Sequence, residues 1–218
     1  RDITEEQIRK ALRETTIKLL ITPVLCGAAY KYKGIQPLLD AVIEYLPSPT
    51  DIGAVIAHDP YEEDKTYTRN PSNNETFAAL AFKLINDPYV GQQTFIRIFS
   101  GKLTSGMSLY NTNKDKNERV GRIFRIKAKE REEISEAGAG EIVALVGMKY
   151  TRTGDTLCDE KQPIVLESIN VPPAVIEMKV TPMDTKNRDK LGEALAKLCN
   201  EDPSFHVHYD DETDETII

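Results

Sequence analysis

The sequence predicts a multidomain protein that combines an α/β segment, an antiparallel β-barrel and an α+β segment. Three observations support this fold class. Apolar residues recur at helical spacing near both ends of the chain, short runs rich in β-branched and aromatic residues fill the middle, and prolines separate these textures. We expect residues 1–50 to end an α/β domain, 51–166 to form the barrel, and 167–218 to form part of a small α+β domain.

The first segment is expected to hold two helices around one short strand. Thr4 and Gln7 have the spacing of a capping box, so a helix should begin at about Glu5. Residues 21–26 have the composition of a strand. An amphipathic helix follows, with apolar residues at Ile35, Leu38, Leu39, Val42, Ile43 and Leu46. One strand cannot form a sheet alone, so we expect the segment to be the tail of a larger domain.

The middle segment is expected to be the barrel, with strands from about Phe77 to Leu166. Runs such as QTFIRIFSG and EIVALVGM alternate with turns such as SGKLTSG and NTNKDKNE, and no helical period lies between them. A polar and weakly patterned stretch that ends at Glu75 comes before these strands. Strands in succession without helices favour an antiparallel barrel or sandwich.

The last segment is expected to be a β-α-β unit. The runs AVIEMKV and FHVHY alternate between apolar and polar residues, and Pro203 ends the helix between them. One face of that helix carries Leu191, Ala194, Leu195 and Leu198. The final ETII is expected to begin a further strand.

The charge of the chain is unevenly distributed. The net charge is −7, yet residues 114–131 hold eight basic and three acidic residues. If residues 119–129 form one strand, four cations share a face with Gly121 and Ile123, opposite Val120, Phe124, Ile126 and Ala128. These four candidate residues for a nucleic-acid contact, which the resemblance described below makes RNA-binding candidates, are Arg119, Arg125, Lys127 and Lys129. A solvated outer face without a ligand remains the alternative, and Arg122 on the opposite face is unexplained.

Several functional classes lack support in the sequence. No apolar run approaches the roughly 20 residues that span a bilayer, and three scattered cysteines form no paired motif, so we expect a soluble, cytoplasmic protein. The phosphate-binding motif G-x-x-x-x-G-K-[ST] is absent. His206 and His208 lack a third ligand at suitable spacing, so no metal site is predicted. No catalytic residue is assigned.

Five long and irregular phrases carry a resemblance to a known family. They are VLCGAAYKYKGIQPLLDAVIEYLPSPTDI, FAALAFKLINDPYVGQQTFIRIFSGKLTSG, ERVGRIFRI, REEISEAGAGEIVALVGMKYTRTGDTLCD and EDPSFHVHYDDETDETII. Together, and in one register over almost the whole chain, they closely resemble bacterial elongation factor G. The resemblance implies the end of a P-loop GTPase domain in 1–50, the translation-factor barrel called domain II in 51–166, and the first half of the ferredoxin-like domain III in 167–218.

The resemblance also implies a function and a nucleotide. Elongation factor G is a GTPase that moves tRNA and mRNA through the ribosome and, with ribosome recycling factor, splits ribosomes. Its guanine-contacting turn stands here as Gly27, Ala28 and Ala29, with Ala28 in place of the usual serine. GTP with Mg²⁺ is expected in the full-length parent and no cofactor on this chain, which lacks the phosphate loop, both switches and the N-K-x-D element. We expect the chain itself to be inactive as a GTPase.

The resemblance further implies partners. The family contacts small-subunit ribosomal RNA through the barrel, so the ribosome and its RNA are the expected partners of a monomer that binds no membrane. Two alternatives remain: a ribosome- or RNA-binding module without GTPase activity, and a specialised paralogue that acts in ribosome recycling or protection. The observation that supports the paralogue is Ala28, which stands in place of the usual serine.

Overall fold

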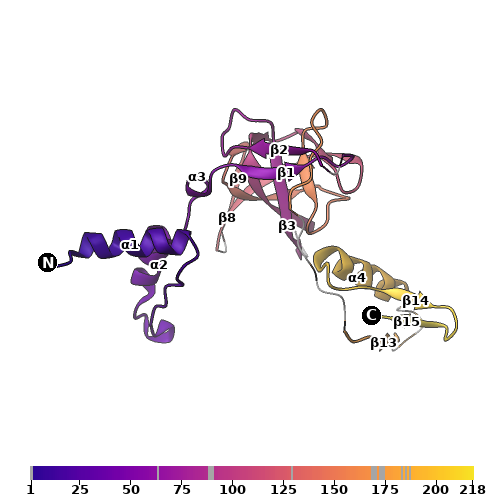
Figure 1. Ribbon diagram of the computed structural model, residues 1–218. Coiled ribbons are helices and arrows are strands. Elements are labelled where there is room, and N and C mark those ends of the chain that lie inside the picture. The colour runs from indigo at the N-terminus through magenta and orange to yellow at the C-terminus, as the bar shows by residue number, and fades with distance from the viewer. Residues whose placement is uncertain are drawn as a thin grey trace. The chain divides into compact units, whose positions relative to one another are not determined.

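The computed structural model describes residues 2–62, 64–87, 91–128, 130–167, 171, 175–182, 184, 186 and 188–218. The chain forms two compact units, Arg1–Gly53 and Ala54–Ile218 (Figure 1). The second unit contains both the barrel strands and the C-terminal α+β segment. No helix in the described ranges is long and apolar enough to span a membrane.

The two long helices of the first unit lie where they were predicted, and the first begins at Glu5 as expected. Helix α1 (Glu5–Ile17) begins with the predicted capping box, in which Thr4 Oγ1 accepts from the Gln7 amide at 3.3 Å. Helix α2 (Ile35–Tyr45) contains the predicted amphipathic pattern. A 3₁₀ turn, η1 (Ala29–Lys31), precedes it, and a short helix, α3 (Pro49–Ile52), follows it. Sequence periodicity therefore located both long helices of this unit.

The predicted strand at residues 21–26 is not formed. These residues carry no strand assignment, because an extended segment becomes a strand only when a neighbouring strand satisfies its backbone hydrogen bonds. The apolar residues Leu38, Val42 and Leu46 of the α2 region stay about half exposed. They line an apolar hollow of about 450 Å³ beside α1 and the 19–25 segment. The unit thus presents an apolar surface that its own described residues do not fill.

The barrel consists mainly of one antiparallel sheet of eight strands in the order β7-β6-β12-β3-β4-β11-β8-β9. Its members are β3 (Ala78–Asp87), β4 (Gly91–Ser100), β6 (Ser108–Asn111), β7 (Lys116–Arg119), β8 (Arg122–Lys127), β9 (Glu130–Ile134), β11 (Ile142–Val146) and β12 (Thr156–Cys158). Two further antiparallel pairs complete it: β1 (Val55–His58) with β2 (Thr66–Arg69), and β5 (Lys102–Thr104) with β10 (Glu136–Gly138). The predicted antiparallel barrel is therefore confirmed.

Two apolar clusters form the barrel core. The larger gathers inward residues of the eight-stranded sheet, including Ile96, Leu109 and Leu145, which are fully buried. The smaller gathers Ala57 of β1 with Cys158 of β12 and other residues.

Strands β1 and β2 lie in the polar stretch before Glu75, where no strand was predicted. Their apolar signal is weak, because Ile56 of β1 points outward and Arg69 of β2 is buried.

The C-terminal segment contains β13 (Lys179–Val180), α4 (Arg188–Glu201), β14 (His208–Asp210) and β15 (Glu215–Ile217). Strand β15 lies between β13 and β14 and is antiparallel to both, so β13 and β14 are parallel, as the predicted β-α-β unit requires. The predicted final strand is confirmed as β15. The predicted first strand is shorter than expected, and Ala174, where it was to begin, lies outside the described residues.

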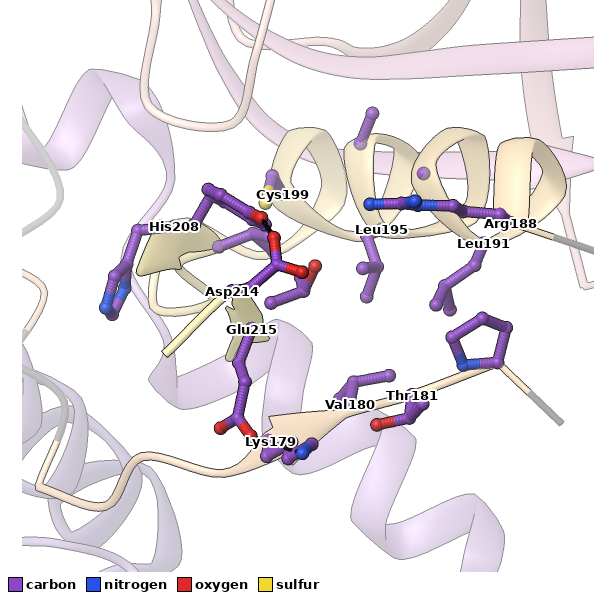
Figure 2. Close-up of a pocket in the computed structure, with 16 residues that line it drawn as sticks. Lys179, Val180, Thr181, Arg188, Leu191, Leu195, Cys199, His208, Asp214 and Glu215 are labelled. Carbon is purple, nitrogen blue, oxygen red and sulfur yellow. Dashed lines mark hydrogen bonds and ion pairs between the residues drawn. The ribbon is translucent and has the colours of Figure 1, made fainter. Parts of the chain in front are cut away.

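Helix α4 and the C-terminal sheet line an open pocket of about 670 Å³ (Figure 2). Leu191 and Leu195 project from α4 toward Val180 of β13. Lys179 and Glu215 form an ion pair across the β13–β15 edge. The pocket between helix and sheet is thus lined by both apolar and charged side chains.

Substituting Gly101 tests how tightly the barrel closes. Its φ is +76°, and an added Cβ would lie 2.6 Å from Phe77 Cα and 2.8 Å from Phe77 N. Because backbone cannot move aside cheaply, we expect Gly101→Ala to lower the free energy of unfolding by more than about 2 kcal/mol. Urea unfolding followed by circular dichroism measures this change.

Gly154→Ala is the matched control, because Gly154 also has a positive φ, +95°, but an added Cβ meets nothing within 4 Å. Its expected cost is about 1 kcal/mol, from the backbone conformation alone. Equal costs for the two variants would contradict the close approach at Gly101.

Candidate nucleic-acid interface

The predicted single strand over residues 119–129 is two strands. Strand β7 ends at Arg119 and β8 begins at Arg122. Between them Gly121 passes so close to β11 that an added Cβ would lie 2.4 Å from the Val146 carbonyl oxygen. A chain that must pass another strand at this distance cannot continue as one regular strand, so the predicted alternation over the whole run is wrong.

Because residues 119–129 form two strands, some of them do not lie on the side that was predicted for them. Ile123, expected on the exposed side, is fully buried in the core, while Ala128, expected in the core, is an exposed turn residue with φ +54°.

Arg122, unexplained from sequence, is exposed and its guanidinium lies 5.4 Å from the ring centre of Phe124. Arg119 donates from Nε to the Gly106 carbonyl at 3.2 Å. Lys129 lies outside the described residues.

Arg125 and Lys127 do lie together, but acidic residues accompany them. Arg125 pairs with Glu141 at 2.8 Å and with Glu132 at 3.7 Å, and Lys127 pairs with Glu132 at 3.6 Å. The hydrogen bond to Glu141 raises the pKa of the Arg125 guanidinium, and the same bond lowers the pKa of the Glu141 carboxyl group. Exposed ion pairs of this kind are weak and screened by salt, so phosphate groups can compete for these cations. The RNA-binding role of this face stays a prediction.

The structure brings together a second group of cations that sequence reasoning did not single out. Lys114 and Lys116 of the β6–β7 hairpin lie beside Lys149 and Arg152 of the β11–β12 loop, around Tyr150. The Lys116 ammonium lies 4.2 Å from the centre of the Tyr150 ring. We call these five residues the Tyr150 patch. The basic run from Lys114 was a signal for two of them, but Lys149 and Arg152 stand more than thirty residues later in the sequence.

Two carboxylates hold the β11–β12 loop against the barrel. The side chain of Glu118 is buried and accepts from the Lys149 and Tyr150 amides, the latter at 2.9 Å, and from the Thr151 hydroxyl. Asp155 accepts from the Arg152 amide at 2.8 Å and from Asn111 Nδ2 at 2.9 Å. The loop that carries three members of the patch is therefore fixed by hydrogen bonds to two buried acidic residues. A lone Glu in a basic strand gave no sequence signal for this role.

The predicted guanine-contacting turn is a closed loop in the first unit. Ala28 and Lys33 exchange two backbone hydrogen bonds, of 3.0 and 3.2 Å. Gly27 and Gly34 lie so close that a Cβ on Gly34 would be 3.1 Å from Gly27 Cα. Backbone contacts thus hold the turn without a serine hydroxyl at Ala28. The Ala29 amide makes no hydrogen bond with any described residue, so it is free to donate to an external carbonyl.

No metal site accompanies this turn. Within the described ranges, no group of three His, Cys, Asp or Glu residues is placed to bind a metal ion. One free amide suits a guanine carbonyl, but the sequence contains no phosphate-binding loop to hold the rest of a nucleotide.

Comparisons with known proteins place the chain in a family. Residues 76–160 match the family model for elongation factor G domain 2, and residues 171–218 match the model for elongation factor G domain III. The two matched stretches together cover more than half of the chain and follow one another in domain order. The chain therefore belongs to the elongation factor G family.

A solved structure is similar to almost the whole chain. A protein of Thermus thermophilus, known from its crystal structure, is 26% identical in sequence and superposes with a TM-score of 0.75 over 99% of this chain. The chain spans 30% of the length of that protein. The similarity thus includes the first unit, which neither family model covers.

Removing the Glu118 carboxylate tests its role in holding the loop. Glu118→Ala leaves two backbone amides and the Thr151 hydroxyl without their acceptor, so we expect the free energy of unfolding to fall by about 3 kcal/mol. Denaturant unfolding of the 218-residue chain measures the loss.

Glu133→Ala serves as control, because Glu133 is exposed on β9. Its expected effect is within about 0.5 kcal/mol. If both variants unfold at the same denaturant concentration, Glu118 does not hold the loop.

Proposed function

We propose that this chain is part of a translational GTPase of the elongation factor G type, which uses GTP to move tRNA and mRNA through the ribosome. The observation that carries the proposal is the succession of elongation factor G domains II and III along one chain. Within the proposal, residues 1–53 end the GTP-binding domain. The apolar side of α2 supports this, because Leu38, Val42 and Leu46 suit burial beneath the rest of an α/β domain.

The proposed nucleotide is GTP with Mg²⁺, bound by the full-length protein. The free Ala29 amide, at the edge of the turn closed by Ala28 and Lys33, supports a contact with the guanine carbonyl. Such an amide contact needs no side chain, so the alanines of the turn are compatible with it. The phosphates and the metal would be held by residues outside these 218.

The proposed partners are the ribosome and its small-subunit RNA, reached through the barrel. The exposed cations of the barrel support an RNA contact, because counterion release from phosphates favours binding to grouped lysines and arginines. The protein is proposed to act in the cytoplasm as a monomer, with ribosome recycling factor as a further partner.

A specialised paralogue for ribosome recycling or protection is the second candidate, and Ala28 is the observation that favours it. A translocation assay and a ribosome-splitting assay on the full-length protein separate the two. Activity only in splitting supports the paralogue, and activity in translocation supports the translocase. Ribosome binding without GTP turnover in the full-length protein would instead support an RNA-binding module.

The 218-residue chain is expected to release no phosphate from GTP above background, with or without ribosomes. Catalysis of phosphoryl transfer depends on positioning and charge stabilisation of the γ-phosphate, and the sequence lacks the loop that provides them. A phosphate-release assay on purified chain tests this, with the full-length protein as positive control. Turnover by the chain alone would contradict the assignment of its first unit.

Charge changes on β8 and β9 test the predicted basic face. If Arg125 and Lys127 contact ribosomal RNA, Arg125→Glu/Lys127→Glu should weaken binding to small subunits at least about tenfold. Glu132→Gln should strengthen binding, because it frees both cations from their shared carboxylate. Sedimentation with small subunits at several salt concentrations measures both effects.

Glu133→Gln provides the matched control, with the same charge change one residue along β9, where no ion pair is formed with any described residue. Equal binding by the Glu132 and Glu133 variants would contradict the prediction that the basic face contacts ribosomal RNA.

A further inference from the structure

We propose that the Tyr150 patch binds one unstacked nucleotide of an RNA strand, with the base on the Tyr150 ring and the adjoining phosphates on Lys114, Lys116, Lys149 and Arg152. The inference rests on the proposed function in one respect, the choice of RNA as the polyanion. It adds a second contact surface to the barrel, separate from the predicted face on β8 and β9.

The cations of the patch are available for an external partner. None of the four forms an ion pair with a carboxylate in the part of the chain that the structure describes. Lys116, Lys149 and Arg152 are exposed, and Lys114 is partly buried. Arg125 and Lys127, by contrast, each have a carboxylate within 4 Å. Of the two basic surfaces, the Tyr150 patch therefore offers the greater uncompensated charge.

The acidic side chains near the patch are engaged elsewhere. Asp115, in the turn between Lys114 and Lys116, accepts a hydrogen bond of 2.7 Å from the Tyr110 hydroxyl. Glu118 and Asp155 accept from the loop amides and from Asn111, as described above. These bonds direct the three carboxylates to protein donors rather than to the lysines and the arginine. The positive charge of the patch therefore has no carboxylate partner among the described residues, and phosphate groups can supply the missing negative charge.

The aromatic ring at the centre argues for a nucleotide rather than a bare phosphate. Tyr150 is 48% exposed, so part of its ring is accessible to an external base, and the Lys116 ammonium lies 4.2 Å from the ring centre. Lysines beside an exposed ring are the arrangement by which proteins stack single-stranded bases while neutralising their backbone. The hollow at this place has a volume of about 270 Å³. That volume is slightly below the range of about 300 to 1,000 Å³ that is usual for ligand sites, so it suits a single base or phosphate and not a duplex.

The patch is also held in place before any ligand arrives. Glu118 fixes the amides of Lys149 and Tyr150, and Asp155 fixes that of Arg152. A loop tied to the barrel by such bonds loses little conformational entropy on binding. The patch is therefore a preformed surface and not a loop that must order itself.

Binding of two RNA hairpins by the 218-residue chain tests the proposal. One short hairpin carries a single bulged adenosine, and the other is identical but fully paired. We expect the chain to bind the bulged hairpin more tightly, and Tyr150→Ala to lower that affinity about tenfold while changing affinity for the paired hairpin little. Tyr150→Phe, which keeps the ring, should retain the preference. Fluorescence anisotropy with labelled RNA gives these affinities.

Charge reversal tests the phosphate contacts. Lys149→Glu/Arg152→Glu should weaken binding of both hairpins at least about tenfold and reduce the slope of log affinity against log salt by about 1 to 2. The matched control is Lys10→Glu/Lys18→Glu, which makes the same charge change at exposed positions in and just after α1. Thermal unfolding by circular dichroism confirms that each variant is folded.

The outcomes separate this inference from the proposed function. Equal affinities for the patch variant and the control would overturn the inference, and so would an absence of bulge preference in the wild-type chain. Neither result involves GTP or translocation, so the translocase proposal would be unaffected. Conversely, a full-length protein without GTPase or translocation activity would contradict the proposed function while a patch-dependent bulge preference still stood.

Discussion

Backbone hydrogen bonding across the eight-stranded antiparallel sheet is the constraint on which the rest of the second unit depends. Strand β12 is only three residues long, yet it joins Leu80 of β3 and Asn111 of β6 through Thr156 and Leu157. Because β12 pairs on both sides, the loop before it must end beside the β6–β7 hairpin. That single pairing brings Lys149 and Arg152 to Lys114 and Lys116, although the two pairs are far apart in sequence.

Carboxylates decide which of the barrel cations are available to a partner. Arg125 and Lys127 of β8 form ion pairs with Glu132 and Glu141, and these pairs partly neutralise the two cations. Beside Tyr150 the acidic groups instead accept from backbone amides and from Asn111. Both surfaces carry basic residues, but the positive electrostatic potential is weaker where carboxylates pair with the cations. The distribution of acceptors therefore matters as much as the number of cations.

The first unit contains a turn whose shape is held by backbone contacts. Reciprocal bonds between Ala28 and Lys33, and the close approach of Gly27 and Gly34, close the loop without a hydroxyl at Ala28. A guanine contact through a main-chain amide depends on that shape and not on the side chain. The exposed apolar face of α2 is the other notable feature of this unit, because burying it requires further structure.

The sequence by itself determined the three long helices, the antiparallel barrel and the family, because periodicity, turn residues and long characteristic phrases are local properties of the chain. It did not predict η1 or α3. It placed Glu5 and Ile35 at helix starts correctly. It failed at residues 21–26, since a strand needs a partner, and at residues 119–129, since Gly121 must pass Val146 at close range. Only the tertiary structure decided that Ile123 is buried, that Arg125 is paired and that Tyr150 lies among cations without ion pairs to the described carboxylates. The physical reason is that strand pairing and ion pairing join residues remote in sequence, and no local pattern records which residues will meet.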